Sequence, residues 1–174
     1  MTVYFTSDNH FGHNNILQLG KGRPFDSLSE MEEAMIENWN RVVQKGDRIY
    51  HLGDFSFKAK QDHIDSILRK LNGDKFLISG NHDSKAVLKS QHWSQVWQYR
   101  EISIEGQKII LSHYPFQEWN RSWHGSWHLH GHCHGNLAWT PTIKRLDIGV
   151  DCYDFTPVSF EKIKEDMEKM IEWK

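Results

Sequence analysis

Five short clusters of aspartate, asparagine and histidine divide this chain of 174 residues, and each stands near the end of a predicted β-strand. In chain order they are Asp8–His10, Gly53–Asp54, Gly80–Asp83, His113 and Gly131–His134. Oxygen ligands mixed with imidazole suit catalytic divalent metals, whereas structural zinc is usually held by several thiolates. The clusters therefore favour a fold that gathers the ends of distant strands around catalytic metals.

Apolar periodicity predicts alternating strands and helices in the first half of the chain. Predicted strands cover residues 2–7, 48–52 and 75–79, and amphipathic helices cover 29–45 and 61–71. Such alternation favours right-handed crossovers onto a parallel sheet, whose ligands gather beyond the carboxyl ends of the strands. The first three clusters occupy those positions.

The second half has a different pattern. Residues 97–104 and 108–113 read as two strands of a hairpin around Glu105–Gln107. Further strands are predicted at 127–130 and 143–150, and a final helix at 159–173. No linker or repeat interrupts the chain, so we expect a single domain spanning residues 1–174.

Net charge and hydropathy limit the possible partners. A formal net charge of −2 gives no overall attraction to nucleic acid or to an anionic membrane, so no extended nucleic-acid-binding surface is expected. No apolar segment approaches about 18 residues, and no secretory leader is visible. We therefore expect a cytoplasmic protein without a membrane partner. The sequence leaves the oligomeric state open.

Spacing within the clusters indicates which side chains share a site. Asp8 and His10 are two residues apart, as are His132 and His134, and such pairs point to the same side of an extended backbone. A glycine precedes Asp54, Asn81 and His132, and glycine permits sharp turns and close backbone approach.

Several other histidines and both cysteines stay outside the predicted ligand set. Cys133 and Cys152 are too few for a disulfide framework, and we expect reduced thiols. Cys133 stands between two predicted ligands and should point away from them. The histidines at 51, 128 and 130 could equally be packed or surface residues.

The ordered set Asp-x-His, Gly-Asp, Gly-Asn-His-Asp, His and Gly-His-x-His resembles the motifs of the calcineurin-like metallophosphoesterase superfamily, over residues 8–134. The extension Phe11-Gly12-His13 resembles the small stand-alone members found in bacteria and phages. The resemblance implies an α/β fold, a four-layer αββα sandwich with two central mixed β-sheets, and metals held by loops along one edge.

The resemblance also implies two divalent metal ions. One would be bound by Asp8, His10, Asp54 and His134, and the other by Asn81, His113, His132 and again Asp54. A bridging carboxylate suits two-metal hydrolysis, in which the cations lie about 3.5 to 4 Å apart. Manganese is the first choice, with iron, zinc, cobalt and nickel also compatible.

In the implied mechanism, a hydroxide held between the metals attacks phosphorus in line. His82 should face the substrate, where it would protonate the leaving oxygen or stabilise the transition state, and Asp83 is expected to orient it. Two roles are equally compatible with His13. It could contact a phosphate oxygen, or it could simply mark the start of a helix.

Residues 116–127 lie between two metal-ligand clusters and contain Trp119, Trp123, Trp127 and Arg121. This segment is predicted to form one wall of the active site. Its aromatic faces could stack on a nucleobase, and Arg121 could bind a phosphate. Packing of the tryptophans onto the core is the somewhat favoured alternative, and their roles stay open.

Differences from the motifs of well-known members of this superfamily narrow the range of possible substrates. Protein serine/threonine phosphatases continue the second cluster with Asp-Arg-Gly, whereas Phe55-Ser56-Phe57 follows Asp54 here. The chain is also too short for an added substrate domain. The leading hypothesis is hydrolysis of phosphodiesters, cyclic or nucleotide-like ones included. The alternatives are a phosphomonoesterase acting on small phosphates and a metal-binding interaction module without catalysis.

Overall fold

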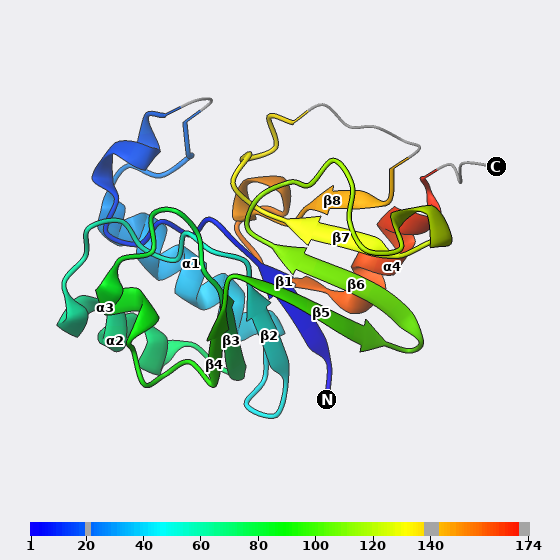
Figure 1. The fold of residues 1–174 in the computed structure, drawn as a ribbon. Coiled ribbons are helices and arrows are strands. Elements are labelled where there is room, and N and C mark those ends of the chain that lie inside the picture. Colours follow the sequence, from blue (N-terminus) through cyan, green and yellow to red (C-terminus); the bar gives the residue numbers. More distant parts are fainter. Residues whose placement is uncertain (20–21, 138–142, 171–174) are drawn as a thin grey trace.

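The computed structural model describes residues 1–19, 22–137 and 143–170, and it contains two β-sheets (Figure 1). The first sheet has the order β4-β3-β2-β1-β9. Its strands are β1 (Val3–Thr6), β2 (Arg48–His51), β3 (Asp74–Ile78), β4 (Gln95–Trp97) and β9 (Val158–Ser159). β1, β2 and β3 are parallel, as predicted, β4 adds a further parallel strand, and β9 runs antiparallel to β1.

The second sheet has the order β5-β6-β7-β8. Its strands are β5 (Tyr99–Ile104), β6 (Gln107–Ser112), β7 (Trp127–His130) and β8 (Arg145–Asp147). β5 and β6 form the predicted hairpin, while β6, β7 and β8 run parallel to one another. Both sheets are therefore mixed, which confirms the predicted α/β fold class.

The helices are α1 (Leu28–Val42), α2 (Gln61–Lys70), α3 (Lys85–Leu88) and α4 (Phe160–Glu168), with short 3₁₀ turns η1 (Asn14–Leu17), η2 (Ser122–His124) and η3 (Val150–Cys152). α1 begins where the Ser27 side chain accepts a hydrogen bond from the Glu30 backbone amide. Its buried residues Met31, Met35 and Trp39 recur every four residues and form one face. None of the described helices has the length and apolar character needed to cross a membrane.

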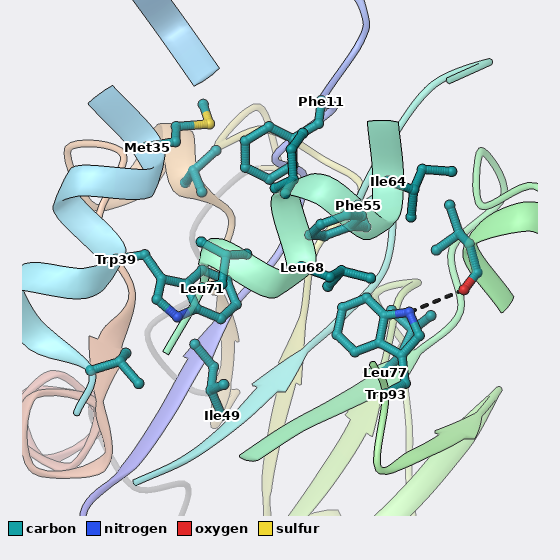
Figure 2. Close-up of a cluster of buried hydrophobic side chains, with 14 of the residues drawn as sticks. Phe11, Met35, Trp39, Ile49, Phe55, Ile64, Leu68, Leu71, Leu77 and Trp93 are labelled. Atoms are coloured by element: carbon teal, nitrogen blue, oxygen red, sulfur yellow. Dashed lines mark hydrogen bonds between the residues drawn. The ribbon is translucent and has the colours of Figure 1, made fainter. Parts of the chain in front are cut away.

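Two hydrophobic clusters fill the interior. The first packs α1 and α2 against one face of the first sheet (Figure 2) and includes Met35, Trp39, Ile49, Ile64, Leu68 and Leu77. The second joins the other face of that sheet to the second sheet, and it includes Phe5, Leu52, Ile78, Ile109, Leu111 and Leu129. α4 adds Phe160, Ile163 and Met167 to this second cluster. The first sheet is thus covered on both faces.

The predicted strand at residues 97–104 is in fact two strands in different sheets. Trp97 ends β4 and pairs with Ile78 in the first sheet, whereas β5 begins at Tyr99 in the second. The Trp97 ring stacks on Phe76 of β3, with ring centroids 5.8 Å apart. This contact holds Trp97 in the first sheet, and the chain changes sheets at Gln98.

Other differences concern short or terminal elements. α3 and β9, of four and two residues, were not predicted, because elements this short carry no periodic signal. The strand predicted at 143–150 is limited to β8, since the chain turns into η3 at Val150. The final helix is described as α4, and the predicted end at Trp173 lies outside the described residues.

Candidate metal centre

The predicted ligands follow the carboxyl ends of five strands. Asp8 follows β1, Asp54 follows β2, Asn81 follows β3, His113 follows β6 and His132 follows β7. Backbone hydrogen bonds join the loops, from the amide of Asp8 to the carbonyl of Gly53 at 2.9 Å and from the amide of Gly131 to the carbonyl of His113 at 3.0 Å. The amide of His132 donates to the Asp8 carboxylate at 3.0 Å, so loops from both sheets meet at one edge.

Six of the predicted ligands form two compact groups, in each of which one donor atom per residue lies within 4.8 Å of the others. The first group is Asp8, His10 and His134, and the second is Asp54, His113 and His132. Asn81 joins the second group, because its Oδ1 lies 3.0 Å from Nε2 of His113. All seven predicted ligands are thus brought together in the division that the resemblance implied.

The carboxylate of Asp54 lies between the two groups. Its Oδ2 is 3.6 Å from Nε2 of His10 in the first group and 3.5 Å from Nε2 of His113 in the second. Its Oδ1 accepts a hydrogen bond of 2.8 Å from the backbone amide of His82. Burial opposes ionisation of Asp54, but His113 and the other donors lower its pKa to about 2. A charged carboxylate therefore faces both groups.

The surroundings of His10 indicate whether these residues fit a metal ion. Its side chain is buried, yet neither ring nitrogen has a hydrogen-bond partner among the described residues. An unsatisfied buried polar group costs about 1–3 kcal/mol, so such groups are rare in native proteins. Burial lowers the pKa of His10 to about 2, which leaves a neutral imidazole with a free lone pair. A cation in the first group would satisfy it.

The backbone of the ligand loops is strained. Five of the seven predicted ligands have φ between 49° and 70°, namely Asp8, His10, Asp54, His132 and His134. Residues other than glycine rarely adopt this left-handed conformation, and such strain of about 1–3 kcal/mol per residue persists only where the surroundings enforce it. The concentration of strain at the ligands is typical of a functional site.

The three glycines that precede predicted ligands are all needed for space. A Cβ added at Gly53 would lie 2.6 Å from the backbone nitrogen of Gly80 and 2.6 Å from Nδ1 of His113. A Cβ added at Gly80 would overlap the Asp54 carboxylate, and one added at Gly131 would overlap the Asp8 carboxylate and the Ser7 hydroxyl. Of the three, only Gly53 has positive φ, at 94°. All three allow the close backbone approach that the sequence suggested.

An ion pair that the sequence did not reveal orients His134. Oδ2 of Asp151 lies 2.7 Å from Nδ1 of His134, and Arg23 donates to both Asp151 oxygens at 2.9 Å. Arg23 also donates to the backbone carbonyls of Asp8 and Asn9. A carboxylate on the outer nitrogen of a ligand histidine fixes its ring orientation. Neither Arg23 nor Asp151 lies in a ligand cluster, so no sequence motif pointed to them.

Burial and this ion pair together shift the pKa values of the ionisable side chains in and beside the first group. Burial opposes ionisation of Asp151, but His134 and Arg23 keep its pKa at about 2. Burial would lower the pKa of His134, yet the hydrogen bond to Asp151 raises it overall. Asp8 is fully buried, and this burial raises its pKa to about 7.

His82 lies beside the first group, whereas Asp83 has surroundings different from those predicted. The exposed His82 ring has its centroid 5.5 Å from that of His10, next to the first group. Asp83 does not orient this ring. Its oxygens instead accept hydrogen bonds of 2.8–3.0 Å from the backbone amides of Gly80, Asp54 and Phe55. Asp83 therefore ties the second cluster to the third, and burial raises its pKa to about 6.

Aromatic rings flank the two groups. The His13 ring lies 5.4 Å from that of His10 and 4.1 Å from that of Phe57. His13 precedes η1 but makes no side-chain capping hydrogen bond. On the other side, the exposed Tyr114 ring lies 4.8 Å from that of His132. Tyr114 immediately follows His113, and Phe57 comes shortly after Asp54. This closeness in sequence to predicted ligands is the one signal that could have identified the two rings.

Arg121 and the tryptophans are not brought to the ligand groups. The carbonyl of Arg121 accepts from the amide of Ser126, just before β7, whereas His132 follows the opposite end of that strand. Trp119 and Trp127 are buried, and together with the exposed Trp123 they line a cavity of about 630 Å³. The segment therefore does not form the predicted wall, and packing of the loop accounts for Trp119 and Trp127.

The residues that the sequence left outside the ligand set belong to neither group. His51 is buried, and its Nε2 lies 2.8 Å from Oδ1 of Asn9. His128 is also buried, stacked against Phe116 with ring centroids 5.0 Å apart. Both are packed within the protein.

No family model matches this chain. An uncharacterised protein of Methanocaldococcus jannaschii is 34% identical over 172 residues, which span 96% of this chain and 92% of that protein. The gene 66 protein of Mycobacterium phage L5 is 32% identical over 83 residues, covering 47% of this chain and 39% of its own length.

Two solved structures show the same fold. A protein of unknown function from Aquifex aeolicus has a TM-score of 0.72 and 26% identity, with 98% of this chain and 99% of that chain covered. The phosphoesterase YfcE of E. coli has a TM-score of 0.50 and 15% identity, with 86% and 78% covered. The chain therefore belongs to the same family as the Methanocaldococcus jannaschii protein, and it shares its fold with the phosphoesterase YfcE.

Proposed function

We propose that this protein is a phosphoesterase that binds two divalent cations and hydrolyses phosphodiesters, cyclic or nucleotide-like ones included. The observation that carries the proposal is the position of Asp54. One of its oxygens lies 3.5–3.6 Å from a histidine of each donor group. A carboxylate shared in this way is the arrangement that a two-metal hydrolase requires.

The donor sets fit two cations. Asp8, His10 and His134 would hold one, Asn81, His113 and His132 would hold the other, and Asp54 would be shared. When bound, the cations would lower the pKa of water and neutralise charge on the phosphoryl oxygens. Carboxylate and amide oxygens together with imidazole are compatible with manganese, our first choice for reconstitution.

His82 is the proposed acid that acts on the leaving group. Its ring is exposed beside the first group, and its backbone amide is held by Asp54. The side chain belongs to neither donor group, so it is available to give a proton to the leaving oxygen. Asp83 supports this position indirectly, because its carboxylate fixes the loop in which His82 lies.

The surroundings favour a diester over a small monoester. Phe57 contacts His13 and His82 beside the first group, and Tyr114 contacts His132 beside the second. A phosphodiester carries an organic group on each side of phosphorus, and an aromatic ring on each side of the centre can contact both. Such rings also accept nucleobases by stacking. We therefore expect a small phosphoester or nucleotide-like substrate.

The proposal is tested by comparing a chromogenic bis(nitrophenyl) phosphate with the corresponding monoester, using manganese-reconstituted protein. We expect faster hydrolysis of the diester, and the Asp54→Ala variant should be inactive, which excludes a contaminating enzyme. Preference for the monoester would make the protein a phosphatase. Lack of activity on both substrates, with two metals bound, would favour the interaction module instead.

Removal of the shared carboxylate should weaken both metal sites. We expect Asp54→Ala to bind fewer than two metals per chain and to lose activity, because each donor group loses an oxygen ligand. Metal content measured by plasma mass spectrometry after gel filtration tests this. The exposed Asp62→Ala variant is the control. Two metals still bound to Asp54→Ala would contradict the bridging role.

Loss of His82 should slow the reaction without removing metal. We expect His82→Ala to bind both metals and to lose about 10² to 10⁴ in rate, the usual effect of a positioned acid or base. Steady-state kinetics and metal content should be measured in parallel. The matched control is His124→Ala, an exposed histidine in η2. Unchanged turnover in His82→Ala would exclude His82 from the mechanism.

Metal affinity should increase with pH between about 6 and 8, because a metal must displace the proton that buried Asp8 holds below a pKa of about 7. The raised pKa of His134 acts in the same direction. Titration calorimetry in buffers with different ionisation enthalpies measures both affinity and proton release. Equal affinity at both pH values, with no proton released, would contradict this expectation.

A further inference from the structure

Three donors outside the two groups meet at the end of β7 and β8. His130 is the last residue of β7, Asp147 is the last residue of β8, and the two are paired in the register of the sheet. Cys133 lies in the loop after β7. One donor atom of each of these residues lies within 4.8 Å of the others. The cluster therefore combines nitrogen, sulfur and oxygen donors from three segments.

The cluster shares a loop with the two groups but uses a different side chain of it. Cys133 stands between His132 and His134, which belong to the second and first groups, and its thiol turns to His130 and Asp147 instead. Neither group, nor Asn81, offers a sulfur donor. A metal bound through Cys133 would therefore be chemically distinct from the other two.

The donors are already held in place. The two oxygens of Asp147 accept hydrogen bonds from the amides of Gly149 at 2.9 Å and Gly135 at 3.0 Å. The His130 ring is buried, and its Nδ1 lies 2.8 Å from the carbonyl oxygen of Gly131. Its other ring nitrogen has no hydrogen bond within the described part of the chain. Ligands fixed by such outer contacts lose little freedom when a metal binds.

The cluster also has access to solvent. His130, Asp147 and Cys152 line a cavity of about 550 Å³. Cys152 belongs to η3, and its Sγ lies 3.2 Å from the position that a Cβ on Gly135 would occupy. Water from this cavity can complete a coordination sphere around three protein donors.

We propose that His130, Cys133 and Asp147 bind a third metal ion, and that this ion is zinc. Zinc accepts tetrahedral sets of sulfur, nitrogen and carboxylate ligands, and a thiolate favours it over manganese. The role of this zinc is to anchor the loop at residues 131–134. That loop supplies His132 to one donor group and His134 to the other.

Cobalt titration of the metal-free, reduced protein tests the proposal, because a thiolate bound to Co²⁺ gives an intense near-ultraviolet charge-transfer band. The two groups contain only nitrogen and oxygen donors, so this band reports the third site alone. We expect the band in the unaltered protein and in Cys152→Ser, its loss in Cys133→Ser, and its disappearance on addition of zinc. Metal content should fall from three to two ions per chain in Cys133→Ser.

A second pair of variants separates this site from the proposed enzyme. Asp54→Ala should keep the band while losing metal elsewhere, and Asp147→Asn should weaken the band while keeping two metals. Two ions bound to Cys133→Ser would also show that this variant is folded. Absence of the band, its survival in Cys133→Ser, or its loss only in Cys152→Ser would overturn the assignment, whatever the protein hydrolyses.

Discussion

The position of the Asp54 carboxylate is the constraint on which the rest of the centre depends. One oxygen faces His10 and His113, and the other accepts the amide of His82. The space it occupies exists because residue 80 has no side chain. Its own backbone is in the left-handed conformation, held by the Asp83 carboxylate on its amide. The donor groups and the loop of His82 therefore share a single support.

Strain and burial in the centre are balanced by a polar network beneath it. Five predicted ligands have positive φ, Asp8 and Arg23 are buried ionisable groups, and Arg23 is paired with Asp151. Buried charges are tolerated where they are paired and hydrogen-bonded, and Arg23 satisfies two carbonyls of the first cluster as well as Asp151. The network holds the donor side chains in place, so that little rearrangement would accompany metal binding.

Much of the centre could be predicted from the sequence, because metal ligands must be particular residue types at strand ends. All seven predicted ligands converge, and both sheets are mixed as expected. The roles of Asp83 and Asp151 could not be predicted, since their partners are backbone amides and residues remote in sequence. The change of sheet at Gln98 was also hidden, because the residues before and after it both have strand character.

That change of sheet has a consequence for assembly. Residues before Gln98 supply Asp8, His10, Asp54 and Asn81, and residues after it supply His113, His132 and His134. Each donor group therefore combines side chains from both sheets, and neither half of the chain contains a complete set. Cations bound there would link the two sheets at the edge where their loops meet. The chemistry of the centre would then depend on correct docking of one sheet against the other, and a misdocked chain would be inert.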